Sequence, residues 1–321
     1  MADEVRARAH ANIALSKYWG KRETGDNVPA TPSISLALDR LATDTTVRRI
    51  DAPSDSILLN GSPASELDTE RLRGYLDLWR GAGLIDGSFQ VDSTNHFPTS
   101  AGLASSSSGF AALATALAAL AERPLDSVEI SRLARRGSAS AARSVTGGLS
   151  ELLTGDDPAS DQVLPPDKVP WGMVVAVVDA SAKETGSTEG MQLSRTTSPF
   201  YAAWVDAARN DFHRIREACL KFDLEIAGSV MEANMYAMHS VMLSTRPALL
   251  YWTGTSLALL REVRSWRKGG LAVWATVDAG PHVVFLTQQS SLDTVAKLAV
   301  EIPGVRETFS CLPAPGARVV A

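Results

Sequence analysis

The chain has 321 residues, of which 45% are hydrophobic and 21% are charged, and its formal net charge is −5. This length suggests about two domains, each large enough to bury its own core. The slight acidity argues against a nucleic-acid or anionic-membrane surface, because both require clustered positive charge.

Neither the cysteines nor the apolar runs indicate secretion or membrane insertion. The two cysteines, Cys219 and Cys311, cannot build a disulfide framework, and a chain this long does not need one. The N-terminus, MADEVRARAH, lacks the apolar core of a signal peptide. The longest apolar run, residues 110–121, is shorter than the roughly 18–20 residues of a membrane span. We therefore expect a cytoplasmic protein.

The first half of the chain mixes strand and helix patterns. Alternating apolar residues predict strands at 34–38 and 45–50, and apolar residues at helical spacing predict helices at 68–80 and 126–136. The Pro, Asp and Ser content of residues 155–170 is typical of an exposed loop.

An almost continuous apolar run at 171–178 predicts a buried strand. After about residue 182 the pattern changes, and long amphipathic helices are predicted at 199–222 and 224–243. A hairpin is predicted next, because two β-rich segments, 271–277 and 282–286, are separated by the turn sequence Asp-Ala-Gly-Pro. A helix at 292–300 and a short terminal strand would complete a second α+β layer.

The segment Pro98-Thr-Ser-Ala-Gly102-Leu-Ala-Ser105-Ser-Ser-Ser108 has the composition of a phosphate loop. It runs directly into an alanine-rich helix former at 109–121. Small residues let the backbone approach an anion, while the free N–H groups of the first helical turn and the serine hydroxyls can donate to it. An ordinary serine-capped buried helix would show the same pattern. No GxxxxGK[ST] or GxGxxG motif is present, so a nucleotide would need this other design.

This loop resembles the phosphate motif of the superfamily of galactose, homoserine, mevalonate and phosphomevalonate kinases. The resemblance implies a two-domain α+β fold, with a ribosomal-protein-like ATP-binding domain at 1–182 and a ferredoxin-like α/β layer at 183–321. The residues that it implies for nucleotide binding are Pro98, Ser100, Gly102, Leu103, Ala104, Ser105, Ser106 and Ser107.

A longer segment near the N-terminus, Ala11-Asn-Ile-Ala-Leu-Ser-Lys17-Tyr-Trp-Gly-Lys21, is similar to a signature of diphosphomevalonate decarboxylases. The resemblance implies that Lys17 is catalytic and that Asn12, Tyr18 and Lys21 bind substrate. The alternative is a strand end that carries two solvated lysines.

A second stretch, Arg136-Gly-Ser138-Ala-Ser140-Ala-Ala-Arg143-Ser-Val-Thr-Gly-Gly148, resembles the same family. A guanidinium can donate two parallel hydrogen bonds to a carboxylate. The resemblance therefore implies that Arg143 holds the C1 carboxylate of the mevalonate substrate, the group that is lost as carbon dioxide. Ser138 and Ser140 would donate to the substrate phosphates. The alternative is a tight helix with surface serines.

A third segment, Thr276-Val-Asp278-Ala-Gly-Pro-His282, matches the Asp-Ala-Gly-Pro turn of the family and implies that Asp278 is the catalytic carboxylate. An Asp that serves only hairpin geometry is the alternative. The segment Lys183-Glu-Thr-Gly-Ser187-Thr-Glu-Gly-Met191, followed by Arg195, looks like the opening of the second domain in this family, and Arg195 joins the candidate substrate ligands.

By the same resemblance, Glu232-Ala-Asn234 and Met238-His239 stand at family positions on a helix. Two segments depart from the family pattern near substrate-binding loops. Thr31-Pro-Ser-Ile-Ser35 replaces a sequence of the Asn-Ser-Ser type, and His282 stands where Asn is usual.

The resemblance implies an ATP-dependent decarboxylation of mevalonate 5-diphosphate, by phosphorylation of the C3 hydroxyl, in a homodimer. Mg²⁺ would arrive with ATP, because the five histidines are scattered and show no metal-ligand spacing. Three alternatives stay open: a mevalonate 5-phosphate decarboxylase, a mevalonate 3-kinase, and an inactive nucleotide- or metabolite-binding regulator on the same fold.

Overall fold

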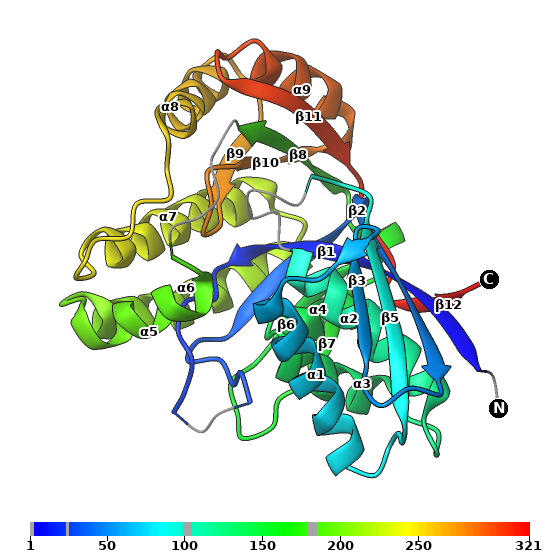
Figure 1. The fold of residues 1–321 in the computed structure, drawn as a ribbon. Helices are drawn as coiled ribbons and strands as arrows, with labels where there is room; N and C mark the ends of the chain where they lie inside the picture. The colour runs from blue at the N-terminus through cyan, green and yellow to red at the C-terminus, as the bar shows by residue number, and fades with distance from the viewer. Residues whose placement is uncertain (1–2, 24–25, 99–104, 179–184) are drawn as a thin grey trace.

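The computed structural model describes residues 3–23, 26–98, 105–178 and 185–321. These form an eight-stranded sheet and a four-stranded sheet with helices packed on both (Figure 1). The predicted mixture of strands and helices is confirmed. Among the described residues, no helix combines the length and apolar character needed to cross a bilayer.

The first sheet has the strand order β12-β1-β2-β5-β3-β4, and β6 extends it from β2 to β7. Its strands are β1 (Glu4–Ser16), β2 (Ser33–Ile50), β3 (Ser56–Leu59), β4 (Ser62–Pro63), β5 (Ser88–Asn95), β6 (Leu149–Leu152), β7 (Ser160–Leu164) and β12 (Arg318–Val320). The helices that pack with it are α1 (Glu66–Gly81), α2 (Ser105–Leu120), α3 (Ser127–Gly137) and α4 (Ala141–Thr146).

The second sheet is antiparallel, with the strand order β11-β8-β10-β9. Its strands are β8 (Trp171–Val178), β9 (Val273–Val277), β10 (Val283–Gln288) and β11 (Val305–Cys311). The helices of this part are α5 (Ser187–Thr197), α6 (Tyr201–Leu220), α7 (Leu224–Leu243), α8 (Gly254–Lys268) and α9 (Leu292–Val300). Two short 3-10 helices cover Pro166–Lys168 and Gln289–Ser291.

Local signals account for where several helices begin. At α3, Asp126 and Glu129 form a reciprocal capping box, and Thr253 and Ser256 do the same at α8. At α7, the side chain of Asp223 accepts from the N–H of Ile226. These side chains satisfy backbone donors that the first turn of a helix leaves free.

Two predictions for the first half of the chain were wrong in detail. The strands expected at 34–38 and 45–50 are parts of one strand, β2, which pairs with β6 at its start and with β5 in its second half. The expected loop at 155–170 contains β7, a polar strand that pairs with β6.

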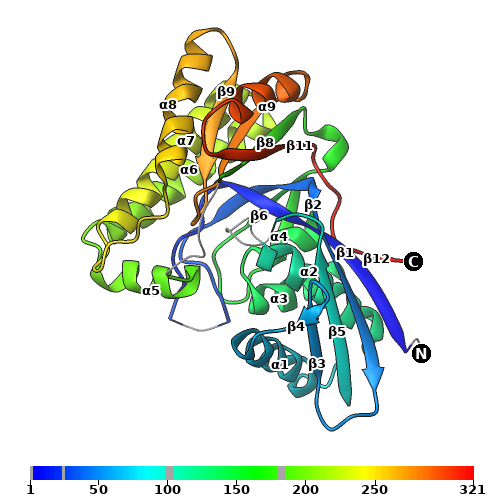
Figure 2. The same cartoon turned by 45° about the horizontal axis from the view of Figure 1, so that its top comes forward.

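The chain crosses between the two sheets more often than a division into two consecutive halves suggests. The buried strand expected at 171–178 is confirmed as β8, but β8 pairs with β10 and β11 in the second sheet. Conversely, the last strand, β12, returns to pair with β1 in the first sheet, beside the N-terminus (Figure 2). The division at 182 stays a prediction.

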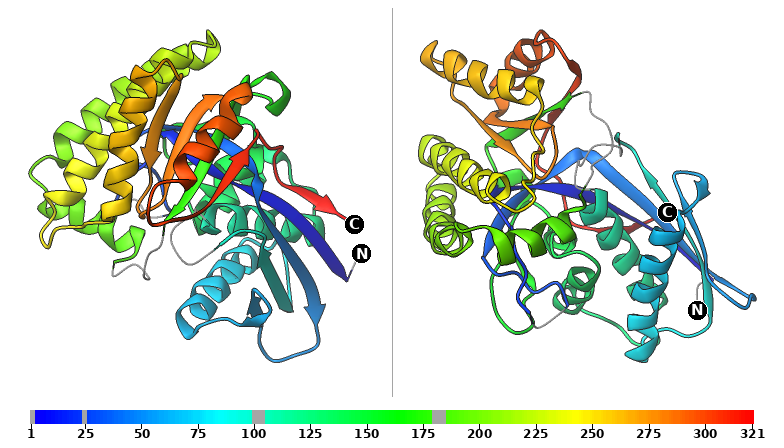
Figure 3. Two further views of the ribbon diagram at one scale, coloured as in Figure 1. Left: turned by 90° about the horizontal axis from the view of Figure 1, so that it is seen from above. Right: turned by 60° about the vertical axis from the view of Figure 1, so that its left-hand side comes forward.

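A shared hydrophobic core holds the two parts together. It combines Ile13 and Leu15 of β1 with Met173 of β8 and with Phe212 and Ile215 of α6. The helices α6 and α7 lie on one side of the second sheet, near the end of β1 (Figure 3). The core therefore joins β1 to β9 through Leu15 and Trp274, and the ends of both strands carry candidate site residues.

Candidate active site

A cavity of about 1180 Å³ opens where the ends of β1 and β9 approach α2, α4 and α5. The predicted site residues that line it are Asn12, Lys17, Tyr18, Lys21, Ser105, Ser106, Ser138, Ser140, Arg143 and Asp278. These residues are scattered over most of the sequence, and only folding brings them to one place.

Lys17 and Asp278 contact each other directly in this cavity. Lys17 follows the last residue of β1 and Asp278 follows the last residue of β9, and the ammonium donates to Oδ1 of the carboxylate. The lysine side chain is 1% exposed and the aspartate side chain is 31% exposed. Burial lowers the pKa of Lys17, and the charge and hydrogen bond of Asp278 oppose that shift. The carboxylate thus faces the cavity with a buried cation behind it.

Arg143 is a second buried cation beside this pair, and it is held in a different way. Its Nε donates to Ser35 Oγ at 2.7 Å and its Nη1 donates to Ser33 Oγ at 2.6 Å. Burial lowers its pKa to about 10, while the charge of Asp278 acts in the opposite direction. Within the described part of the chain, its guanidinium forms no ion pair with a carboxylate.

Both serines that accept from Arg143 belong to residues 31–35, the segment that departs from the family pattern. In this chain the segment therefore supplies the hydroxyl groups that orient Arg143. The other departure from the family pattern, His282, forms a structural hydrogen bond. Its Nδ1 accepts from the backbone N–H of Val178 at 3.0 Å, which ties the turn after β9 to β8.

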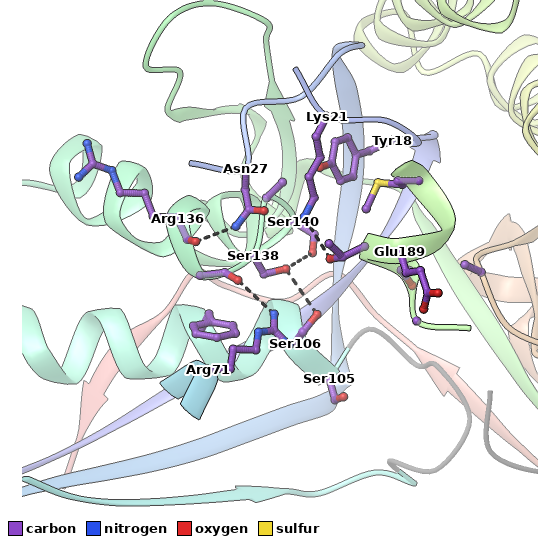
Figure 4. A pocket seen from close by; sticks show the side chains of 18 of the residues that line it. Tyr18, Lys21, Asn27, Arg71, Ser105, Ser106, Arg136, Ser138, Ser140 and Glu189 are labelled. Carbon is purple, nitrogen blue, oxygen red and sulfur yellow. Dashed lines mark hydrogen bonds between the residues drawn. The ribbon is translucent and has the colours of Figure 1, made fainter. Parts of the chain in front are cut away.

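Serine hydroxyl groups form another wall of the cavity. Ser138 Oγ lies 3.2 Å from Ser140 Oγ and 3.4 Å from Ser106 Oγ, so the segment between α3 and α4 meets the start of α2 (Figure 4). Asn12 donates to the backbone carbonyl of Ser140 and to Ser144 Oγ, at 2.9 and 2.8 Å. Its own Oδ1 is buried without a partner among the described residues.

Tyr18 and Lys21 come from the turn after β1. Lys21 Nζ donates to Thr188 Oγ1 of α5 at 3.1 Å, and burial together with the charge of Arg71 lowers the Lys21 pKa to about 8. The Tyr18 hydroxyl is buried and finds no partner among the described residues, and burial raises its pKa. Polar atoms of this kind are expected to be satisfied by a bound ligand or by water.

Other predicted residues lie elsewhere. Arg195 does not line the cavity, and its Nη1 donates to Glu23 at 2.6 Å. Ser107 is buried within α2, and Pro98 lies outside the lining. Four of the residues predicted for nucleotide binding, Ser100, Gly102, Leu103 and Ala104, fall outside the described residues.

Sequence reasoning missed several residues that line the cavity. Arg71 of α1 is one: its guanidinium lies 4.7 Å from the centre of the Phe110 ring and donates to the carbonyl of Gly137 at 3.1 Å. Asn27, whose Nδ2 donates to the carbonyl of Arg136 at 2.7 Å, is another. Figure 4 shows both side chains beside the serine wall. Nothing in the helical spacing of α1 distinguishes Arg71 from its solvated neighbours.

Two family models match the chain. Residues 9–163 match the diphosphomevalonate decarboxylase-like N-terminal domain, and residues 173–311 match the mevalonate 5-diphosphate decarboxylase C-terminal domain.

Relatives agree over nearly the whole length. A diphosphomevalonate decarboxylase of Candida albicans is 35% identical, and the alignment covers 94% of this chain and 90% of the relative. A phosphomevalonate decarboxylase of Haloferax volcanii is 30% identical, with 93% and 92% covered.

Solved structures agree with the fold. The crystal structure of mevalonate diphosphate decarboxylase from Staphylococcus aureus is 33% identical, with a TM-score of 0.91 and coverage of 100% and 99%. A second structure, described as MDDEF in complex with MVAPP, AMPPCP and magnesium, is 34% identical, with a TM-score of 0.91 and coverage of 99% and 98%. These matches confirm the two-domain α+β fold expected from the phosphate-loop resemblance. The chain belongs to the diphosphomevalonate decarboxylase family.

Proposed function

We propose that this enzyme catalyses the ATP-dependent decarboxylation of mevalonate 5-diphosphate to isopentenyl diphosphate, with release of ADP, phosphate and carbon dioxide. The observation that carries the proposal is the arrangement of Asp278, Lys17 and Arg143 in one cavity. A buried guanidinium that has no carboxylate partner in the described chain suits an anionic ligand, because an isolated buried charge is costly.

In the first step the γ-phosphoryl group of ATP passes to the C3 hydroxyl of the substrate. Asp278 would orient that hydroxyl and accept its proton late in the transfer, because a carboxylate is too weak a base to remove it beforehand. Lys17, in contact with the carboxylate, would fix its position and balance its negative charge.

In the second step the C3–O bond breaks and its electron pair leaves with phosphate. The electrons of the C1–C2 bond then form the C2=C3 double bond as carbon dioxide departs. Arg143 would align the C1 carboxylate for this step. A strong ion pair would also stabilise the ground state, so its contribution should be mainly orientation. The hydrogen bonds to Ser33 and Ser35 support that role, because they restrict the guanidinium plane.

The diphosphate tail would bind the donors around the serine wall, which are Tyr18, Lys21, Ser138 and Ser140, and Asn12 would support them through Ser140. Arg195 stays a candidate for this tail, although it would have to exchange Glu23 for the phosphate. Several donors suit a polyanion better than one.

The nucleotide would bind at the start of α2. The first turn of this helix fits the triphosphate, because Ser105 and Ser106 line the cavity there. Pro98, Ser107 and the loop residues Ser100, Gly102, Leu103 and Ala104 complete the proposed set. Magnesium bound with the nucleotide would neutralise phosphate charge. We further propose that the enzyme is a cytoplasmic homodimer. Light scattering on the purified protein tests its oligomeric state.

Mevalonate 5-phosphate is the nearest alternative substrate, because a relative that is 30% identical is a phosphomevalonate decarboxylase. A 3-kinase would stop after the first step, and an inactive regulator would bind without turnover. Purified protein should be assayed with ATP and mevalonate, its 5-phosphate or its 5-diphosphate, with carbon dioxide and phosphorylated products followed together. Gas release that is fastest with the diphosphate supports the proposal. Accumulation of a phosphorylated product without gas supports a 3-kinase, and ATP binding without any turnover supports a regulator.

A further inference from the structure

Helix α7 runs past both partners of the Lys17–Asp278 pair. It packs against β1 and β9, the strands whose ends carry these two residues. Figure 1 shows α7 beside the end of β1 and below the second sheet. Two buried polar side chains of this helix, Asn234 and His239, point at the backbone next to the pair.

Asn234 holds the lysine side. The backbone N–H of Lys17 donates to Asn234 Oδ1 at 2.7 Å, and Asn234 Nδ2 donates to Asp211 Oδ2 of α6 at 3.0 Å. The orientation of the amide follows from its partners. A backbone N–H can only donate and an ionised carboxylate can only accept, so the oxygen must face Lys17 and the nitrogen must face Asp211.

His239 holds the aspartate side. Its Nε2 lies 3.2 Å from the carbonyl oxygen of Val277, the residue before Asp278. A carbonyl can only accept, so the proton is on Nε2. Burial lowers the His239 pKa to about 4, and the ring is therefore neutral at physiological pH. The ring also packs on Trp252, with 4.4 Å between the ring centres.

The turn that carries Asp278 is tied on its other side as well. Ser256 Oγ of α8 donates to the carbonyl of Pro281 at 2.6 Å. These two hydrogen bonds hold the backbone on both sides of Asp278, at Val277 and at Pro281. On the side toward β9, the described side chain that donates to this backbone is that of His239.

We propose that Asn234 and His239 form a two-point clamp on α7 that sets the geometry of the Lys17–Asp278 pair. Both are positioning residues, because neither belongs to the described lining of the cavity. Asn234 acts through the backbone of Lys17, and His239 acts through the backbone of Val277, the residue before Asp278. The inference rests on the proposed function for the roles of Lys17 and Asp278. A misplacement of about 1 Å at a reacting group can cost on the order of 10²-fold in rate, so a clamp one hydrogen bond away matters.

The first test separates the donor of His239 from its ring. His239→Phe keeps an aromatic ring against Trp252 and removes the donor, whereas His239→Gln restores an N–H donor at similar reach. We expect His239→Phe to lower kcat about 10- to 100-fold while KM for both substrates stays within about twofold. His239→Gln should recover most of the loss. Ser240→Ala, at the exposed neighbour on the same helix, serves as the control and should leave kcat unchanged.

The second test addresses the other point of the clamp. Asn234→Leu has a similar volume but no acceptor for the Lys17 N–H, and it should lower kcat in the same way with little change in KM. Wild-type kcat in both His239→Phe and Asn234→Leu would overturn the proposal. Equal losses in His239→Phe and His239→Gln would also overturn it, since the ring and not the donor would then matter.

A substrate-independent measurement distinguishes failure of the clamp from failure of the proposed function. Crystal structures of the wild type and of His239→Phe should show the Lys17–Asp278 contact lengthened or broken in the variant. An unchanged contact overturns the clamp, whatever the enzyme turns over. If the wild type turns over no mevalonate derivative, the proposed function fails, and these two structures alone decide the clamp.

Discussion

At the scale of single residues, the site pairs one carboxylate with two cations that are held differently. Lys17 contacts Asp278 directly, whereas Arg143 is held by the hydroxyls of Ser33 and Ser35. The difference suits the two proposed roles. A cation in direct contact holds the carboxylate in place. A guanidinium that is held only by neutral hydroxyl acceptors can still bind a carboxylate of a ligand.

Removal of the Asp278 charge is the most direct test of its role. We expect Asp278→Asn to lower kcat by about 10²- to 10⁴-fold, because the amide can still orient a hydroxyl but cannot take its proton. Carbon dioxide release at saturating substrates measures the effect. Asp293→Asn, at an exposed position on α9, is the control and should match the wild type. A variant at 278 that retains more than half of the wild-type kcat would remove this residue from the mechanism.

Lys21 should give substrate binding a pH dependence. Its pKa is lowered to about 8 in the ligand-free protein, first by burial and then by the charge of Arg71. The cationic form attracts a diphosphate, so the contribution of Lys21 to affinity should be constant below about pH 8 and fall by up to about tenfold per pH unit above it. Calorimetric titration with mevalonate 5-diphosphate between about pH 6.5 and about pH 9.5 measures this pH dependence of the affinity.

The matched variant for this pH profile is Lys21→Arg. An arginine stays charged throughout the range, so the fall above pH 8 should disappear. A profile that is the same in Lys21→Arg and in the wild type would assign the pH dependence to another group.

At the scale of elements, helices α6, α7 and α9 of the second half were predicted from the sequence, whereas helices α5 and α8 and several strands were not. The amphipathic pattern predicted α7 and α9 with the observed bounds. In contrast, polar residues in the middle of β2 interrupt the alternation, so the pattern predicted two strands. The Asp39 carboxylate accepts a hydrogen bond from the backbone N–H of Leu312, and Asp44 forms ion pairs with Arg6 and Arg8. These partners lie far away in the sequence and let one strand continue through polar positions.

Two of the helical glycines, Gly74 and Gly228, should respond in opposite ways to the same substitution. A Cβ at Gly74, in the middle of α1, would meet nothing within 4 Å, whereas a Cβ at Gly228 of α7 would lie 2.3 Å from Trp274 Cδ2. Gly74→Ala should raise the free energy of unfolding by about 0.5–1 kcal/mol through helix propensity. Gly228→Ala should lower it by about 1–3 kcal/mol, because the buried indole must shift.

Urea unfolding of both variants without ligands measures this contrast. Stabilisation by Gly228→Ala would contradict this prediction, because it would show that Trp274 can accommodate an added methyl group between α7 and β9.

At the scale of the whole molecule, the cavity depends on the core that joins the two parts of the chain. Asn12 lies in β1 and Lys17 follows it, and Arg143 lies in α4, which packs with the first sheet. Asp278 instead follows β9 of the second sheet. A ligand that contacts both should stabilise the native state, because it binds only when the two parts are assembled.

We therefore expect the unfolding temperature to rise when mevalonate 5-diphosphate, a non-hydrolysable ATP analogue and Mg²⁺ are added together. At about 100 times Kd, one ligand contributes about 2.7 kcal/mol. Scanning calorimetry measures the shift in unfolding temperature. EDTA should remove the stabilisation that is due to the nucleotide, because it chelates Mg²⁺, and should leave the stabilisation that is due to the mevalonate derivative. An unchanged unfolding temperature at saturating ligands would contradict the proposed binding site.

The amino-acid sequence by itself determined the local features of this protein: the amphipathic helices, the buried strand β8, the β9–β10 hairpin, and, through resemblance, the residues Lys17, Arg143 and Asp278 as candidates. Periodicity and turn chemistry act between near neighbours, so they can be read without a structure. The tertiary structure alone decided that β8 pairs in the second sheet and β12 in the first, that Ser33 and Ser35 contact Arg143, and that Asn234 and His239 contact the backbone of Lys17 and Val277. Each of these contacts joins residues far apart in the chain, and no local pattern specifies such a pairing.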